Sequence, residues 1–113
     1  MKKGKYLITG CAGFIGSNLV KKIYKDYDLI LVDDLSEGSL SNLPKILRKK
    51  LIKNKIQNIK NLKINKLNGI FHLAAQSSVP LSLNNFYKSS TNNIESSLKV
   101  FEIAKEFSSP IIY

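Results

Sequence analysis

Residues 5–33, KYLITGCAGFIGSNLVKKIYKDYDLILVD, decide the fold of this chain. The apolar run 5–9 ends at a glycine and predicts a buried strand. Over residues 14–27, apolar residues recur at three- and four-residue spacing with lysines between them, which predicts an amphipathic helix. The apolar run 29–32 predicts a second buried strand, which ends at Asp33. A strand, a glycine-rich turn, a helix and a second strand therefore follow one another.

Three glycines recur every three residues in the turn, residues 10–16, GCAGFIG. Gly10 can make the tight turn out of the strand, and Gly16 can let the helix pack closely on the sheet. Gly13 lets a diphosphate approach the backbone, because no Cβ stands in the way. The start of the helix offers free N–H groups and a partial positive charge to such an anion. A glycine-rich turn can also stay empty, so its surroundings decide.

Asp33 lies at the end of the second strand and points to the ligand. It follows Gly16 by 17 residues, where a carboxylate can accept hydrogen bonds from the ribose hydroxyls of an adenosine. The same negative charge would repel a ribose 2′-phosphate. We therefore expect NAD, and not NADP, to be the cofactor, and we expect no metal site.

The rest of the chain continues the alternation of strands and helices. Its patterns predict a loop with a short helix over 35–50, a strand at 51–52, a short helix over 57–68, a strand and small-residue turn over 69–75, a helix over 92–107 and a strand from 110. The apolar stripe of the 92–107 helix, which should face the core, is Ile94, Leu98, Phe101 and Ile103, with Ala104 at its edge. This alternation predicts an α/β fold with a parallel sheet and helices on both faces.

The chain has 113 residues and 43% hydrophobic residues, which suits one globular domain. No apolar run approaches the roughly 20 residues of a membrane-spanning helix, and the apolar segment after the basic N-terminus is too short for a signal peptide. The single Cys11 cannot form an internal disulfide. We therefore expect a cytoplasmic protein without a membrane partner.

The formal net charge is +10, and the basic residues are concentrated in one segment. Nine of the 18 basic residues lie between Lys45 and Lys66, a stretch without an acidic residue. Aromatic residues do not interleave this stretch, as they would in a surface for single-stranded nucleic acid. We interpret it as a solvated lysine face and expect no nucleic acid partner; the alternative is a polyanion site.

Three segments together resemble a known family: residues 8–19, ITGCAGFIGSNL; residues 32–38, VDDLSEG; and residues 71–79, FHLAAQSSV. In order and spacing they are similar to the extended short-chain dehydrogenase/reductases, and within them to the nucleotide-sugar epimerase/dehydratase family, which includes UDP-glucose 4-epimerase. The resemblance covers nearly the whole chain. It implies that residues 1–113 are the N-terminal part of an NAD(P)-binding Rossmann domain, a three-layer fold truncated after about the fifth strand.

The resemblance also implies a role for each matching position. The pyrophosphate would be held by Gly10, Gly13, Phe14, Ile15 and Gly16. The adenosine would be held by Asp33, Asp34, Ser36 and Gly38. The nicotinamide side would be lined by Leu73, Ala74 and Ala75, and the sugar pocket by Ser78 and Val79. Three further positions would have structural roles. Asn93 would open the long helix, His72 would pack at the end of a strand, and Cys11 would be a small filler in the turn.

Two departures from the family matter. Where the family usually has a Gly-Asp-hydrophobic element at the adenine, this chain has Asn54, Lys55 and Ile56. Lysine cannot accept a hydrogen bond from the adenine amino group, whereas Ile56 can pack near the adenine. The family's catalytic serine or threonine and its Tyr-x-x-x-Lys motif would follow the strand that begins at Pro110, but the sequence ends at Tyr113. We therefore identify no catalytic residue and expect the chain to be inactive alone.

The leading hypothesis is the NAD-binding portion of a nucleotide-sugar epimerase, which would oxidise a sugar carbon by hydride transfer and return the hydride to the other face. The alternatives are a fragment of a nucleotide-sugar dehydratase or decarboxylase, a non-catalytic NAD-binding remnant and a polyanion-binding protein. A nucleotide-sugar substrate is expected only if a C-terminal part completes the site. The unpaired edge of the last strand leaves open a homodimer or a complementing second chain.

Overall fold

The computed structural model of the chain describes residues 2–74 and 83–112. Its centre is one sheet of five parallel strands in the order β3-β2-β1-β4-β5. The strands are β1 (Lys5–Thr9), β2 (Asp28–Asp33), β3 (Ile52–Lys53), β4 (Gly69–His72) and β5 (Ile111–Ile112). The α/β fold with a parallel sheet is therefore confirmed, and β3 begins one residue later than predicted.

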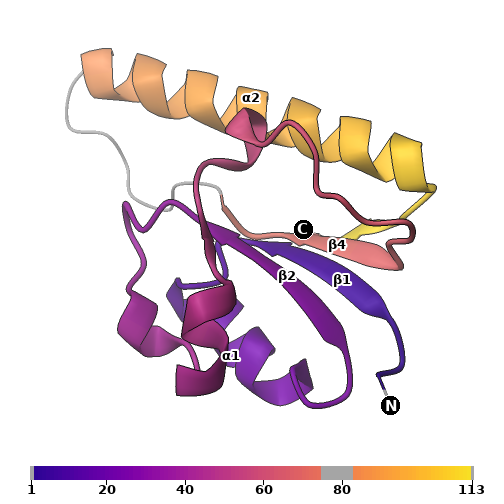
Figure 1. Cartoon of the computed structure of the whole chain (residues 1–113). Helices are drawn as coiled ribbons and strands as arrows, with labels where there is room; N and C mark the ends of the chain where they lie inside the picture. Colours follow the sequence, from indigo (N-terminus) through magenta and orange to yellow (C-terminus); the bar gives the residue numbers. More distant parts are fainter. Residues whose placement is uncertain (1, 75–82, 113) are drawn as a thin grey trace.

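Helices cover both faces of this sheet (Figure 1). They are α1 (Phe14–Ile23) on one face and α2 (Leu83–Phe107) on the other. Leu7 and Ile8 are neighbours in β1 and point to opposite faces, because side chains alternate along a strand. Leu7 belongs to the same apolar core as Val100 of α2, and Ile8 to the same core as Val20 of α1. Both strand residues are fully buried, as expected for a central parallel strand.

The segment between β2 and β3 lies on the α1 side of the sheet (Figure 1). It contains two 3₁₀ helices, η1 (Leu40–Asn42) and η2 (Lys45–Lys50), where the sequence predicts a loop with one short helix. Leu43 and Leu47 anchor the segment, because their buried side chains belong to the core that α1 covers.

The helix α1 ends at Ile23 and not near Tyr27 as predicted. The N-terminal segment before β1 binds the carbonyl groups of the two residues that follow α1. The Lys2 ammonium donates to the carbonyls of Tyr24 and Lys25 at 2.7 and 3.1 Å. A cation placed there also stabilises the negative end of the helix dipole. The chain therefore turns early enough for β2 to begin at Asp28.

The predicted helix over residues 57–68 is wrong. Only the 3₁₀ helix η3 (Ile56–Asn58) forms, and the chain then runs without regular structure to β4. An asparagine competes for the backbone, because Asn61 Oδ1 accepts the N–H of Lys63 at 2.7 Å. Lys63 has a left-handed φ of 55°, which a right-handed helix does not contain. The apolar residues of this stretch still pack on the core: Ile59, Leu62 and Ile64.

The helix α2 begins at Leu83, well before the predicted start at Asn92. Asn93 therefore lies inside the helix and does not open it, which corrects the role that the resemblance implied. Within the part of the chain that the structure describes, no helix combines the length and the apolar character needed to cross a bilayer.

The inner face of α2 also differs from the predicted stripe. Val100 and Ile103 are buried against the sheet, whereas Ile94 and Leu98, which we expected in the core, are each 60% exposed. Phe101 is exposed as well. The helix carries apolar residues on two faces, and periodicity alone does not show which face meets the sheet.

Candidate functional site

A cavity of about 440 Å³ lies at the carboxyl ends of the strands. It occupies the point where the strand order reverses, because β2 and β4 lie on opposite sides of β1. Ligands of open α/β sheets bind at such switch points. The predicted site residues that line it are Gly10, Gly13, Phe14, Ile15, Gly16, Asp33, Asp34, Ser36, Gly38, Ile56, Leu73 and Ala74. Three further predicted residues lie outside the described residues: Ala75, Ser78 and Val79.

The three glycines of the turn have different structural reasons. Gly10 has a φ of +71°, and a Cβ there would lie 2.4 Å from the carbonyl oxygen of Leu73. A Cβ on Gly16 would lie 2.2 Å from the carbonyl oxygen of Gly10. A Cβ on Gly13 would meet only that same oxygen, at an ordinary 3.5 Å. The fold therefore requires glycine at positions 10 and 16, whereas position 13 is open on the protein side.

The backbone N–H groups at the N-terminus of α1 lie next to the open space at Gly13. Gly13 precedes the helix, and its carbonyl accepts the first helical bond from Ser17 at 2.9 Å. The N–H groups of the first helical turn have no acceptor within the helix. Phe14 and Ile15, in the same turn, are 83% and 69% exposed and line the cavity. This end of α1 can therefore hold an anion beside apolar surface that a bound ligand would cover.

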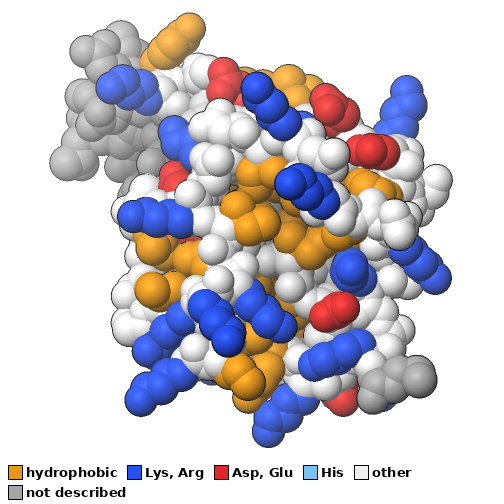
Figure 2. Space-filling view, viewed as in Figure 1, with side chains coloured by type: hydrophobic (Ala, Val, Ile, Leu, Met, Phe, Trp, Pro, Cys, Tyr) orange, Lys and Arg blue, Asp and Glu red, His pale blue; other side chains and the backbone are white. Residues whose placement is uncertain are grey.

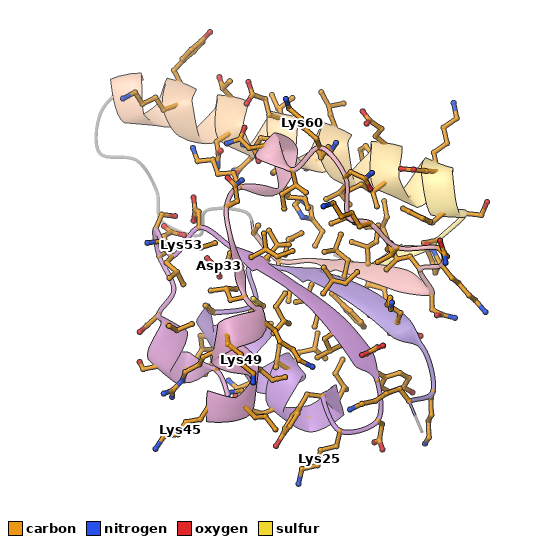
Figure 3. The ribbon with its side chains drawn as sticks, in the orientation of Figure 1. Lys25, Asp33, Lys45, Lys49, Lys53 and Lys60 are labelled. Carbon is orange, nitrogen blue, oxygen red and sulfur yellow. The ribbon has the colours of Figure 1, made fainter. Side chains whose placement is uncertain are left out.

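Asp33 ties the glycine turn to β2. Its carboxylate accepts the N–H of Ala12 at 2.8 Å through Oδ2 and the N–H of Leu35 at 2.8 Å through Oδ1. Leu35 has a left-handed φ of 63°, so the second bond holds a strained residue in place. Figure 3 shows Asp33 at the end of β2, and its register partner in β3 is Lys53. Each carboxylate oxygen has a second lone pair, which leaves capacity for ribose hydroxyls.

The loop after β2 gives the cavity an acidic rim. Asp34 and Glu37 line the cavity together with Asp33. The Asp34 carboxylate accepts both the N–H and the hydroxyl of Ser36, at 3.0 and 2.8 Å, which shapes the loop. A Cβ on Gly38 would lie 2.6 Å from the carbonyl carbon of Ala12, so glycine lets this loop rest on the turn. A ligand with an extra phosphate at this rim would meet several negative charges.

The opposite wall, between β3 and α2, has no carboxylate among the described residues that line it. Ile56 is buried there and forms the apolar floor. Gln57 Nε2 donates to Asn92 Oδ1 at 2.7 Å, which links η3 to α2 across the cavity edge. Lys55 is exposed at the same edge.

Several residues that line the cavity were not predicted from the sequence: Thr9, Val32, Glu37, Gln57, Asn92 and Ser96. Their positions explain why. Thr9 and Val32 are strand-end residues beside the turn, and the switch-point rule could have found them. Gln57, Asn92 and Ser96 reach the cavity only because α2 packs over η3, a contact between segments far apart in the sequence. Asn54 and Lys55, which the resemblance aligned with the adenine element, line the cavity as well.

At the end of β4, His72 is buried and bonded to β1. Its Nδ1 lies 2.7 Å from Thr9 Oγ1, and its Nε2 lies 3.4 Å from Ser97 Oγ of α2. Burial lowers the pKa of His72 below its ordinary value of 6.5. The buried position of His72 at the end of β4 agrees with the packing role that the resemblance implied. The resemblance did not imply its two polar contacts, with Thr9 and Ser97.

Folding stability should therefore fall as the pH decreases. Because its folded pKa is below 6.5, His72 binds fewer protons in the native than in the unfolded state. Its full contribution is present above pH 6.5 and is lost progressively below that value. We expect urea unfolding to show a greater loss between about pH 8 and about pH 5 for the wild type than for His72→Asn. Parallel losses in the two proteins would contradict this prediction.

Cys11 is fully enclosed in the turn. Burial, together with the negative charge of Asp33, raises the pKa of its thiol to about 12. The thiolate that would react is therefore disfavoured at neutral pH. Cys11 fills space, as expected.

The basic residues are distributed over the surface. Figure 2 shows lysine and arginine side chains spread over the visible face, with apolar surface between them. In Figure 3, Lys25 and Lys45 extend away from the protein. Lys49 and Lys50 are likewise exposed. Exposed lysines are what both the solvated lysine face and the polyanion site require, so the two interpretations stay as the sequence left them.

A parallel sheet in this strand order, with a glycine turn and helix N-terminus at its switch point, is the architecture of the Rossmann-type nucleotide-binding folds. The comparison with known proteins narrows this class. The chain belongs to the NAD dependent epimerase/dehydratase family, whose model matches residues 6–112.

Individual relatives agree with this family. A UDP-N-acetylglucosamine 4-epimerase of Methanobrevibacter ruminantium, solved with UDP-N-acetylmuramic acid, is 35% identical with a TM-score of 0.85; the match covers 100% of this chain and 38% of that one. The UDP-glucose 4-epimerase of Thermotoga maritima, solved with UDP-glucose, is 33% identical with a TM-score of 0.78 over 93% of this chain and 35% of that one. A UDP-glucose 4-epimerase of Mycolicibacterium smegmatis is 33% identical over 106 residues, which are 88% of this chain and 34% of the relative. The chain thus spans about a third of the length of the curated relatives it matches.

Proposed function

We propose that residues 1–113 form the NAD-binding portion of a nucleotide-sugar epimerase of the UDP-glucose 4-epimerase type, acting in the cytoplasm. The observation that carries the proposal is the open space at Gly13, where the N-terminus of α1 faces the cavity while Gly10 and Gly16 are closely packed. A diphosphate fits this combination, because it needs backbone donors and no intervening Cβ.

The acidic rim supports NAD over NADP. Asp33, Asp34 and Glu37 line the side of the cavity next to the end of β2. In the proposed pose the adenosine ribose lies there, and Asp33 accepts hydrogen bonds from its hydroxyls. A 2′-phosphate at that ribose would lie among like charges. On the other side of the turn, Leu73 and Ala74 would border the nicotinamide half.

The reaction of the whole enzyme is proposed from the relatives. The three relatives described above are named as UDP-sugar epimerases, which favours epimerisation over dehydration or decarboxylation. In the proposed reaction, a sugar carbon is oxidised by hydride transfer to NAD and the hydride then returns to the other face. The proton-transferring Ser/Thr and Tyr-x-x-x-Lys residues would come from a longer protein or a complementing second chain. Residues 1–113 alone should bind NAD without turning over a UDP-sugar.

Replacing Gly13 with alanine should separate cofactor binding from folding. A Cβ at this position meets only one protein atom, at 3.5 Å, and alanine readily adopts the observed φ of −78°. The Cβ would instead occupy the space of the diphosphate. We expect isothermal titration with NAD to show a loss of about 1.5–3 kcal/mol, the value of one charge-assisted hydrogen bond. The melting temperature should stay that of the wild type.

The same titration with NADP tests the acidic rim. We expect NADP to bind the wild type roughly tenfold or more weakly than NAD, because like charges a few ångströms apart repel by about 1 kcal/mol or more. Equal affinity of the wild type and Gly13→Ala for NAD would contradict the proposed diphosphate position. Equal affinity of the wild type for NAD and NADP would contradict the proposed ribose position.

We further propose that the outer face of α2 associates with a second copy of the chain. This outer stripe consists of the exposed residues Tyr87, Ile94, Leu98 and Phe101. An antiparallel pairing about an axis near Leu98 would place Lys88 near Glu106 of the partner subunit. The stripe is therefore apolar, and the pairing brings one lysine and one glutamate beside it into proximity across the symmetry axis.

Replacing Leu98 with glutamate should disrupt this association. An uncompensated buried charge costs about 3 kcal/mol or more, so sedimentation should show monomers at concentrations where the wild type is dimeric. The matched control is Ile46→Glu, an exposed isoleucine of η2, which should leave the dimer intact. A wild type that sediments as a monomer, or a Leu98→Glu variant that remains dimeric, would contradict the proposal.

A further inference from the structure

If the proposed NAD binding holds, the dinucleotide must span both sides of the glycine turn. Asp33 ends β2 on one side of β1, and Leu73 follows β4 on the other. With the diphosphate at Gly13 and the adenosine beside Asp33, the second nucleoside extends over Leu73 and Ala74. The backbone of these two residues is therefore its wall.

Thr9 fixes the backbone of this wall through hydrogen bonds to Leu73. The N–H of Leu73 lies 3.1 Å from Thr9 Oγ1 and 3.0 Å from the carbonyl oxygen of Thr9. Thr9 and His72 are register partners in β1 and β4, and Thr9 Oγ1 lies 2.7 Å from His72 Nδ1. The hydroxyl can accept the N–H of Leu73 while it donates its one proton to Nδ1, and we assign the ring the tautomer that allows this, with Nδ1 as the acceptor.

The other ring nitrogen connects the same wall to α2. With Nδ1 as acceptor, the ring carries its proton on Nε2, which faces Ser97 Oγ at 3.4 Å. Thr9 is fully buried and His72 nearly so, so water does not compete with these contacts. One imidazole therefore joins the ends of β1 and β4 and the inner face of α2, directly below Leu73.

We propose that His72 is a positioning residue for the second nucleoside of the dinucleotide. The His72 ring orients the Thr9 hydroxyl, and this hydroxyl accepts the N–H of Leu73. The position of the Leu73–Ala74 backbone in the cavity wall is thereby fixed. His72 itself does not touch the cofactor. The only histidine of the chain thus has a role in binding beyond strand-end packing.

The test compares NAD with ADP, which shares the adenosine and diphosphate but lacks the second nucleoside. His72→Phe keeps a ring and removes the acceptor, and Thr9→Val keeps the shape of threonine and removes the hydroxyl. We expect each to weaken NAD about tenfold, as one hydrogen bond allows, and to leave ADP affinity within about twofold. In His72→Asn, Oδ1 can replace Nδ1 as acceptor, so NAD affinity should return to within about threefold of the wild type.

Each result of these titrations has one meaning. Equal losses for NAD and ADP, or no loss for NAD, would overturn the positioning role. If His72→Phe does not fold, Thr9→Val removes the same bond without altering the ring, and its NAD-to-ADP ratio decides. A wild type that binds ADP but not NAD would overturn the role as well, whereas a wild type that binds neither would refute the proposed function itself.

Discussion

Replacing Gly16 with alanine should lower the free energy of unfolding by about 2 kcal/mol or more. The new Cβ would lie 2.2 Å from the carbonyl oxygen of Gly10 and 2.9 Å from the Cα of Cys11. Both are backbone atoms, so no side-chain rotation relieves the clash, and we expect its cost at or above the upper end of the roughly 1–3 kcal/mol that is typical of overpacking. Alanine gains only about 1 kcal/mol over glycine in a helix interior. The clash therefore outweighs the gain in helix propensity.

Urea denaturation of Gly16→Ala and Gly13→Ala would check this prediction. The two variants add the same methyl group to the same turn, three residues apart. Gly13→Ala should keep the stability of the wild type within about 0.5 kcal/mol, the usual range for a substitution that disturbs no contact. Equal stability of the two variants would show that α1 does not approach the turn as closely as described.

Replacing Asp33 with alanine should destabilise the protein by about 2–6 kcal/mol. The carboxylate holds two backbone N–H groups, those of Ala12 and Leu35, and it is only 9% exposed. Each buried donor left without an acceptor costs about 1–3 kcal/mol. NAD affinity should fall in addition, because the turn loses its tie to β2 and the ribose loses its acceptor.

Asp33→Asn provides the matched comparison. Asparagine keeps one side-chain acceptor and loses the charge, so its stability should lie between those of the wild type and Asp33→Ala. Guanidinium unfolding of the three proteins, followed by NAD titration of those that fold, separates the two roles of the carboxylate. Wild-type stability of Asp33→Ala would contradict the structural role, and unchanged NAD affinity in a folded variant would contradict the ribose contact.

The core of the site was predictable from sequence because its determinants are local. Gly10, Gly13, Gly16 and Asp33 lie within one strand-turn-helix-strand unit, and the structure brings all four to the cavity. The reasons assigned to the glycines also agree with the structure, since only Gly13 has space for a ligand where a Cβ would be. The two backbone bonds of Asp33 were not predictable, because they depend on the path of the chain after β2.

The errors in the helices have a common cause. The stretch 57–68 is only weakly patterned, the Asn61 side chain bonds its backbone, and its apolar residues reach the core from an irregular chain. In α2, the sequence pattern contains two apolar stripes, one with Ile94 and Leu98 and one with Val100 and Ile103. Periodicity indicates that a helix forms, but the shape of the surface beneath it selects the stripe that is buried.

The sequence by itself determined the parallel sheet, the glycine turn and the carboxylate at the end of β2, because each follows from residues close together in the chain. Only the tertiary structure decided which face of α2 meets the sheet and which residues of α2 and η3 close the cavity. It also decided that His72 joins β1, β4 and α2 beneath Leu73. These features depend on contacts between segments far apart in the sequence, whose geometry is set by packing and not by local pattern.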